Sequence, residues 1–213
     1  MKIAVVSESP ADEAAIKILV DAIVGHETEL VSAPRLRPGG WPHVLALLPP
    51  SIIKALHYRT DVEGIAVVVD SDDSPVHNEA HEAIEEGYLG CRLCELRTGV
   101  GLTLSRVTAV ANRATLRIAL GVAVPAIEAW YRCGIDPHVM EATWTRKLLG
   151  ETITYDRRSL KIDVYGSQQP GLATQTNAAI QAATRLADNF EILEQLFPVG
   201  FGCFVYDVRS WTE

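Results

Sequence analysis

Short runs of apolar residues alternate with longer amphipathic segments along the chain. Runs of about four to eight apolar or β-branched residues bounded by polar residues are typical of strands. We expect strands at residues 2–7, 29–33, 64–69, 117–124 and 204–208. The run at 64–69 reads Gly-Ile-Ala-Val-Val-Val, which is typical of a parallel strand that helices cover on both faces.

Apolar residues spaced by three and four positions indicate helices between these strands. We expect helices at residues 10–23, 41–57, 75–86, 92–106, 125–131 and 175–197. Pro49 and Pro50 should break the second helix, because proline lacks the amide donor and clashes with the preceding turn. Pro125 suits the first turn of its helix. The last helix has the best apolar stripe, formed by Ala179, Ala183, Leu186, Phe190, Leu193 and Phe197.

This alternation predicts an α/β fold, in which a layered and largely parallel sheet carries helices on both faces. A length of 213 residues suits one domain. We expect a motif-bearing core over residues 1–130 and a C-terminal elaboration over 131–213, which adds the long helix and a closing strand. Hydrophobic residues at 48% and charged residues at 22% exclude a disordered, collagen-like or coiled-coil chain.

No apolar run reaches the roughly 20 residues that cross a bilayer, and the N-terminus has no secretory signal. We therefore expect a cytoplasmic protein without a membrane segment. Four cysteines in such a chain should stay reduced. The exposed side of the 175–197 helix is a candidate interface, and an oligomer is possible.

Charge is unevenly distributed along the chain. The net charge is −8, but residues 92–161 hold 11 of the 19 basic residues and six of the 27 acidic ones, a local excess of +5. A polyanion could contact the middle of the chain while an acidic centre elsewhere holds cations. The alternative is a scatter of solvated charges.

Carboxylates follow two of the expected strands. Glu8 and Asp12 lie in the loop after the first strand, and Asp70 and Asp72 directly follow the buried strand at 64–69. In an extended chain, alternate residues point to the same side. Converging carboxylates repel each other unless a cation lies between them, and oxygen ligands suit Mg²⁺ or Mn²⁺. The alternative is that Asp72, Asp73 or Ser74 merely caps the next helix.

Histidines and cysteines form a second candidate metal site. His77 and His81 are four residues apart on an expected helix, and Cys91 and Cys94 follow in the order His-x3-His-x9-Cys-x2-Cys. Two imidazoles and two thiolates suit tetrahedral Zn²⁺. In the usual finger the cysteine pair comes first. The alternatives are buried cysteines with solvated histidines, or a role for His77 in orienting a substrate phosphate.

The acidic loops resemble those of a known family. A strand that ends in Glu8 with Asp12 four residues later, and a later strand that ends in Asp-x-Asp at Asp70 and Asp72, resemble the Toprim domain of primases, topoisomerases and OLD-type nucleases. The sequence departs from the family at Ser9, where glycine is usual. This departure changes the expected turn but leaves the carboxylate of Glu8 in place.

A further resemblance lies in the middle of the chain. Residues 122–130 read Val-Ala-Val-Pro-Ala-Ile-Glu-Ala-Trp and resemble small stand-alone Toprim-like proteins of bacteria, in which a helix bearing Glu-x-Trp is followed by a Tyr-x-Lys-like stretch. Residues 155–161 are the candidate for that stretch. The resemblance covers most of residues 1–165.

The resemblance implies Mg²⁺- or Mn²⁺-dependent hydrolysis of nucleic-acid phosphodiesters, with DNA expected before RNA. It implies that Asp70 and Asp72 hold metal and that Glu8 holds metal or acts as general acid/base. Glu128 and Lys161 would complete a second metal site, although either could be an ordinary surface residue. The biological setting in which such families occur suggests a role in bacterial defence against phage. The rival hypotheses are a non-catalytic metal-binding module that acts with a separate ATPase, and phosphoryl or nucleotidyl transfer to a small nucleotide.

Overall fold

The computed structural model of the protein describes residues 1–36, 40–84, 88–111 and 116–212. The described strands form one sheet in the order β2-β1-β3-β4, in which every pair is parallel. These strands are β1 (Lys2–Ser7), β2 (Glu29–Val31), β3 (Gly64–Asp70) and β4 (Arg117–Ala123). Four of the expected strands and the parallel α/β class are therefore confirmed.

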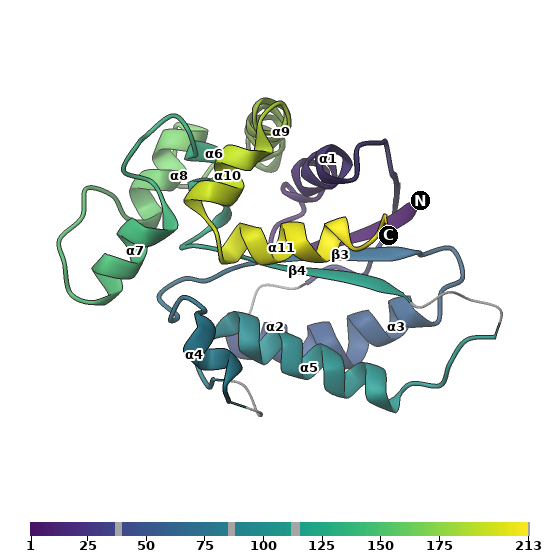
Figure 1. The fold of residues 1–213 in the computed structure, drawn as a ribbon. Coiled ribbons are helices and arrows are strands. Elements are labelled where there is room, and N and C mark those ends of the chain that lie inside the picture. Colours follow the sequence, from purple (N-terminus) through teal and green to yellow (C-terminus); the bar gives the residue numbers. More distant parts are fainter. Residues whose placement is uncertain (37–39, 85–87, 112–115, 213) are drawn as a thin grey trace.

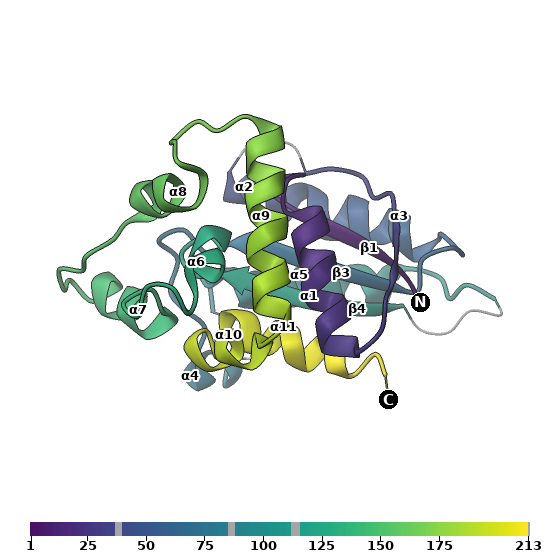
Figure 2. The same cartoon turned by 90° about the horizontal axis from the view of Figure 1, so that it is seen from above.

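Helices cover both faces of the sheet (Figure 1). One face carries α1 (Glu13–Val24), α9 (Leu172–Ala187), α10 (Phe190–Leu196) and α11 (Gly200–Arg209). The other face carries α2 (Trp41–Leu47), the π-helical segment η1 (Leu48–Ile53), α3 (Lys54–His57) and α5 (Arg92–Arg106). The remaining helices are α4 (Glu79–Glu82), α6 (Ile127–Arg132), α7 (Glu141–Leu148) and α8 (Arg157–Tyr165). Figure 2 shows α6, α7 and α8 at the end of the sheet opposite the N-terminus.

Alternate strand residues belong to two separate hydrophobic cores. In β3, Ala66 and Val68 pack with the α1 and α9 side, whereas Ile65, Val67 and Val69 pack with the α2 and α5 side. The strand is thus apolar on both faces because both faces are covered.

The register brings three strand ends together at one edge of the sheet. Ser7 lies opposite Val68, and Asp70 lies opposite Ala123. The loops that follow β1, β3 and β4 therefore begin close to one another. Functional groups of open parallel sheets gather at this edge.

The expected closing strand at 204–208 is wrong, because this segment belongs to helix α11. Its buried residues Phe201, Phe204, Val205 and Val208 fit one face of a helix, which packs against β4. The carboxylate of Asp207 in this helix accepts a hydrogen bond from the amide of Leu120 in β4 at 3.0 Å. The helix therefore covers β4 instead of extending the sheet.

Several expected helices have different boundaries, and the one expected at 10–23 begins only at Glu13. The 175–197 segment is two helices, α9 and α10, which are separated at Asp188 and Asn189. The 41–57 segment does not break at its two prolines, because the wider π-helical turn η1 accommodates them. Pro125 lies outside α6, since Ala126 is extended and precedes the first helical residue, Ile127.

The expected helix at 75–86 is reduced to the short α4, and residues 85–87 lie outside the described residues. The side chain of Asn78 caps α4 by accepting from the amide of Ala80 at 3.0 Å. The alternative role of Asp72, Asp73 or Ser74 as the cap of this helix is therefore wrong. Among the described residues, no helix combines the length and apolar character needed to cross a membrane.

Candidate functional site: a carboxylate pocket and a His/Cys cluster

A cavity of about 270 Å³ lies at the carboxyl ends of β1 and β3. Its wall combines acidic, amide and hydroxyl side chains from the ends of these strands, from α6, and from the α8 to α9 region. The lining residues are Ser7, Glu8, Ser9, Asp12, Val68, Asp70, Ile127, Glu128, Lys161, Tyr165, Gln168, Gln169, Pro170 and Gln175. We call this cavity the carboxylate pocket. It brings together five of the predicted site residues, namely Glu8, Asp12, Asp70, Glu128 and Lys161.

Hydrogen bonds fix the acidic side chains around the pocket. The amide of Asp70 donates to Oε1 of Glu8 at 3.0 Å, and the amide of Ile127 donates to Oδ1 of Asp70 at 2.9 Å. The hydroxyl of Tyr131 donates to Oδ1 of Asp12 at 2.7 Å. The loops after β1 and β3 and the helix α6 are thus joined through three carboxyl groups.

Burial and mutual repulsion raise the pKa values of these carboxyl groups. Burial raises the pKa of Asp70 well above its ordinary value, and the charges of Glu128, Glu8 and Asp12 raise it further. Burial raises the pKa of Asp12 to about 7, although the Tyr131 hydrogen bond opposes this change. Burial also raises the pKa of Glu8 and that of Glu128. Neighbouring carboxyl groups of this kind share protons or hold a cation.

Glu128 carries an unsatisfied oxygen. The residue is only 4% exposed, yet its Oε2 has no hydrogen-bond partner among the described residues. The Lys161 ammonium and, to a smaller extent, the Tyr165 hydroxyl oppose the rise in the pKa of this carboxyl group. A buried polar atom costs free energy until it is paired. The second oxygen of Glu128 is therefore available to a ligand in the pocket.

Asp72 does not share the environment of Asp70. The extended conformation expected here is absent, because Asp72 has a φ of 50°, in the left-handed region. Its carboxylate accepts hydrogen bonds from the guanidinium groups of Arg92 and Arg157. Asp70 lines the carboxylate pocket and Asp72 does not, although both border a neighbouring hollow of about 270 Å³. Two arginines thus neutralise Asp72.

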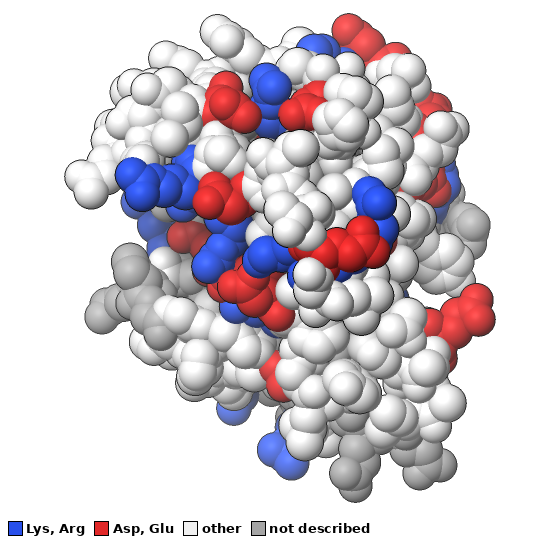
Figure 3. Space-filling model, turned by 90° about the vertical axis from the view of Figure 1, so that its left-hand side faces the viewer, with Lys and Arg blue, Asp and Glu red and all other residues white. Residues whose placement is uncertain are grey.

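Basic side chains from α8 stand beside the acidic groups. The neighbouring hollow is lined by Asp70, Asp72, Ala126, Arg157, Arg158, Lys161 and Gln168. We call Arg157, Arg158 and Lys161 the basic rim. Figure 3 shows basic and acidic side chains crowded together on the face of the molecule that lies at the left of Figure 1. The basic excess predicted in the middle of the chain is therefore partly concentrated next to the carboxylate pocket.

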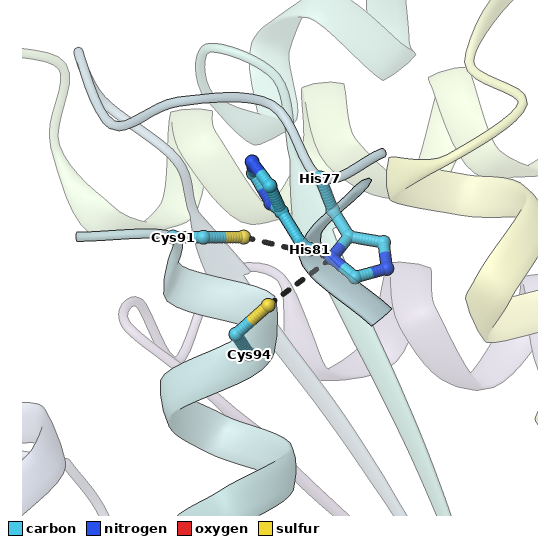
Figure 4. Close-up of side chains that lie close together, drawn as sticks. All are labelled: His77, His81, Cys91 and Cys94. Atoms are coloured by element: carbon cyan, nitrogen blue, oxygen red, sulfur yellow. Dashed lines mark hydrogen bonds between the residues drawn. The ribbon is translucent and has the colours of Figure 1, made fainter. Parts of the chain in front are cut away.

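The four predicted zinc ligands also meet. His77 precedes α4, His81 lies within it, Cys91 directly precedes α5 and Cys94 lies in the first turn of α5 (Figure 4). One potential ligand atom from each residue lies within 4.8 Å of the others. All four residues are buried. We call this group the His/Cys cluster, and its donor set could hold a metal ion.

The spacing inside the cluster is close to that of a tetrahedral zinc site. Nδ1 of His77 lies 3.2 Å from Sγ of Cys94 and 3.7 Å from Sγ of Cys91. Zinc with ordinary bond lengths separates a nitrogen and a sulfur ligand by about 3.6 Å. Nδ1 of His81 is buried without a hydrogen-bond partner among the described residues, so this ring has a nitrogen available. Burial raises the pKa of the Cys91 thiol to about 11, which keeps it neutral until a metal displaces its proton.

Sequence reasoning missed two tyrosines that act at the carboxylate pocket: Tyr165 lines it, and Tyr131 lies behind it as the hydrogen-bond donor to Asp12. Tyr165 follows Lys161 by four residues, and Tyr131 follows Glu128 by three residues. Residues at these spacings share one helix face. The helical spacing from a predicted site residue was therefore the signal that could have found both tyrosines.

The tyrosine of the family-like stretch lies elsewhere. The hydroxyl of Tyr155 donates to the carbonyl of Met140 at 3.3 Å, and its ring stacks on Trp144. Tyr155 does not line the carboxylate pocket, whereas Lys161 does. The tyrosine that accompanies Lys161 is instead Tyr165.

Comparisons with known proteins identify no relative of this chain. No family model matches it, and no significant match was found among curated proteins or solved structures. The resemblance to Toprim domains therefore remains a prediction. The residues of its acidic motifs meet at the carboxylate pocket, except for Asp72, which does not line it.

Proposed function

We propose that the protein is a Mg²⁺- or Mn²⁺-dependent phosphodiesterase that hydrolyses nucleic acid, with the carboxylate pocket as its reaction centre. The observation that carries this proposal is the convergence of four carboxyl groups with raised pKa values on one cavity. Sets of oxygen ligands suit Mg²⁺ and Mn²⁺, which bind through a few carboxylates plus substrate phosphate. A bound cation would favour the ionised carboxylates and remove their mutual repulsion.

Glu8, Asp70 and Glu128 are the residues that would hold the ion. When bound, the ion would lower the pKa of a water molecule and stabilise charge on the reacting phosphate. Asp12 would exchange a proton near neutral pH, because its pKa is raised to about 7 and a general base works best near the operating pH. Lys161 would offset negative charge in the pocket.

The basic rim supports a phosphodiester substrate. Arg157, Arg158 and Lys161 border the hollow that adjoins Asp70, so a nucleic-acid backbone could pass beside the carboxylates while its phosphates contact these cations. Arg157 also pairs with Asp72, which leaves Arg158 and Lys161 as the principal phosphate contacts. We expect DNA to be the substrate, with RNA as the alternative.

The test is a cleavage assay on circular DNA, linear DNA and RNA with Mg²⁺ or Mn²⁺. We expect cleavage by the wild type that requires the metal and is lost in Glu8→Gln, Asp70→Asn and Glu128→Gln. The matched control is Asp163→Asn, which removes an exposed carboxylate on α8 that does not line the pocket. This control should cleave like the wild type.

A folded wild type that cleaves none of these substrates would overturn the catalytic proposal. The next hypothesis would then be a metal-binding module that acts with a partner such as a separate ATPase. Co-purification with a partner, together with activity that appears only in the complex, would support that hypothesis. Stabilisation by a small nucleotide would instead favour nucleotidyl transfer.

We further propose that the His/Cys cluster holds a structural Zn²⁺ ion. Four protein ligands fill the tetrahedral shell and leave no position for substrate, which is the arrangement of a structural zinc site. Elemental analysis should find about one zinc per chain in the wild type and a loss of zinc in Cys94→Ser. Cys203→Ser is the control, because this half-buried cysteine on α11 does not belong to the cluster. Wild-type protein without zinc would contradict the proposal.

A further inference from the structure

We infer that Zn²⁺ in the His/Cys cluster positions Arg92, and that Arg92 holds the loop of Asp70 and Asp72 in the conformation that binds a divalent cation. The inference rests on the proposed function, since it assigns the second cation to the carboxylate pocket. It makes zinc a determinant of the pocket's affinity for that cation, without any contact between zinc and substrate.

Arg92 contacts both acidic loops. Its Nη1 donates to the main-chain oxygen of Asp70, and its Nη2 donates to the carboxylate of Asp72. Nη1 also lies 4.0 Å from Oε1 of Glu8. The guanidinium group lies 4.8 Å from the centre of the Trp41 ring, and the residue is only 8% exposed. A planar guanidinium group can make these divergent contacts together, and a single ammonium group cannot.

The proposed zinc ligands fix the backbone on both sides of Arg92. Cys91 precedes Arg92 directly, and Cys94 lies two residues beyond it in the same turn of α5. The two histidine ligands come from the segment that follows β3 and the acidic loop. Ser71, His77, Cys91 and Arg92 border one hollow of only about 10 Å³, so the cluster and the loop pack directly against each other.

The acidic loop needs such support because Asp72 is in a strained conformation. A φ of 50° is costly for a residue other than glycine unless the surroundings impose it. Arg92 and Arg157 both bind its carboxylate, but the Arg92 side chain is 9% exposed and the Arg157 side chain 43% exposed. Arg92 is therefore the better-fixed of the two. Its displacement would let the loop relax and would move Asp70 within the pocket.

The experiment measures Mn²⁺ binding by the full chain with electron paramagnetic resonance, so that it does not depend on cleavage. The samples are the zinc-containing wild type, the wild type depleted of zinc by a chelator that is then removed, and Arg92→Lys. Lysine keeps the positive charge, which matters because loss of the charge would by itself favour cation binding. Arg106→Lys, at the exposed end of α5, is the matched control.

We expect zinc depletion and Arg92→Lys each to weaken Mn²⁺ binding by about tenfold or more, the usual effect of losing a residue that orients metal ligands. Arg92→Lys should keep its zinc. Retained zinc would show that the fold is intact and that only the contacts of Arg92 with the acidic loop are lost. Unchanged Mn²⁺ affinity in Arg92→Lys would overturn the inference and leave the phosphodiesterase proposal standing. Absence of Mn²⁺ binding in the zinc-containing wild type would overturn both.

Discussion

At the scale of single residues, the carboxylate pocket is defined by acids that keep their protons to a higher pH than usual. Asp12 and Asp70 illustrate this, because burial is the main reason that their pKa values are raised. The types and approximate positions of these acids could be predicted from the sequence, since they follow strands that end at one edge of the sheet. Their burial, and the pairing of Asp72 with two arginines, depend on α6 and α8 and could not be predicted from the loops alone.

The raised pKa values predict how stability depends on pH in the absence of divalent cations. The folded protein holds protons on Asp12 and Asp70 that the unfolded chain has already lost above about pH 4. Unfolding therefore becomes easier as the pH rises from about 4 through 7. We expect the melting temperature to fall between pH 5.5 and 8, and Asp70→Asn to reduce this fall.

The control for this prediction is Asp163→Asn, whose carboxylate is exposed. Its pH profile should match that of the wild type. Addition of Mg²⁺ or Mn²⁺ at pH 8 should restore the lost stability, since a cation replaces the protons. A melting temperature that rises between pH 5.5 and 8 in metal-free protein would show that the acids of the pocket are ionised without cost.

Tyr131 provides a second prediction at this scale. Its buried hydroxyl donates to Asp12, so Tyr131→Phe leaves a buried carboxyl oxygen without that donor. We expect a loss of about 1–3 kcal/mol in the free energy of unfolding at pH 7, measured by urea denaturation. Tyr206→Phe is the control, because Tyr206 is 76% exposed. Equal effects of the two substitutions would contradict the role of the hydrogen bond.

At the scale of the elements, short apolar runs explain the main error of the sequence prediction. The run at 204–208 is apolar enough for a buried strand, but it is too short for periodicity to distinguish a strand from a buried helix. When the segment is extended back to Phe201, its buried residues are spaced by three and four positions, as on one face of a helix. These residues are Phe201, Phe204, Val205 and Val208. The long strand β3 and the helix α5 were predicted correctly because their patterns persist over more residues.

The close packing of α11 on β4 gives the prediction that belongs to this scale. A Cβ atom at Gly200 would lie 2.2 Å from the carbonyl oxygen of Val122, which is backbone and cannot move aside. We expect Gly200→Ala to lower the free energy of unfolding by about 3 kcal/mol, the cost of overpacking a core. Urea denaturation would measure this change.

Gly202 offers a matched control in the same helix. A Cβ atom there would meet nothing closer than 3.9 Å. Gly202→Ala should therefore be neutral or stabilising by up to about 1 kcal/mol, since alanine favours helix. Equal effects of Gly200→Ala and Gly202→Ala would show that α11 does not approach β4 closely at Gly200.

At the scale of the whole molecule, the alternation of strands and helices was sufficient to predict the layered parallel sheet. The strand order β2-β1-β3-β4 was not encoded in any local pattern. Nor was the placement of α6 and α8, which carry Glu128 and Lys161 back to the ends of β1 and β3. The candidate site is thus shared between the predicted strand loops and a helical region whose position depends on tertiary packing.

The distribution of charge over the molecule leads to the last prediction. A protein with a net charge of −8 should bind nucleic acid only where cations are concentrated, and the basic rim is such a place. Arg158→Gln should weaken the binding of DNA to the inactive Asp70→Asn protein and reduce the slope of log affinity against log salt by about 1. Fluorescence anisotropy at several salt concentrations would measure both quantities.

Arg117→Gln is the control for this experiment, because Arg117 is an exposed residue at the start of β4, at the opposite end of the sheet from the carboxylate pocket. If the basic rim guides the nucleic acid, this substitution should leave the slope unchanged even though it alters the net charge equally. Equal effects of Arg158→Gln and Arg117→Gln would mean that only total charge matters. The basic rim would then not direct nucleic acid to the carboxylate pocket, and the substrate of the pocket would have to be sought in another class of molecule.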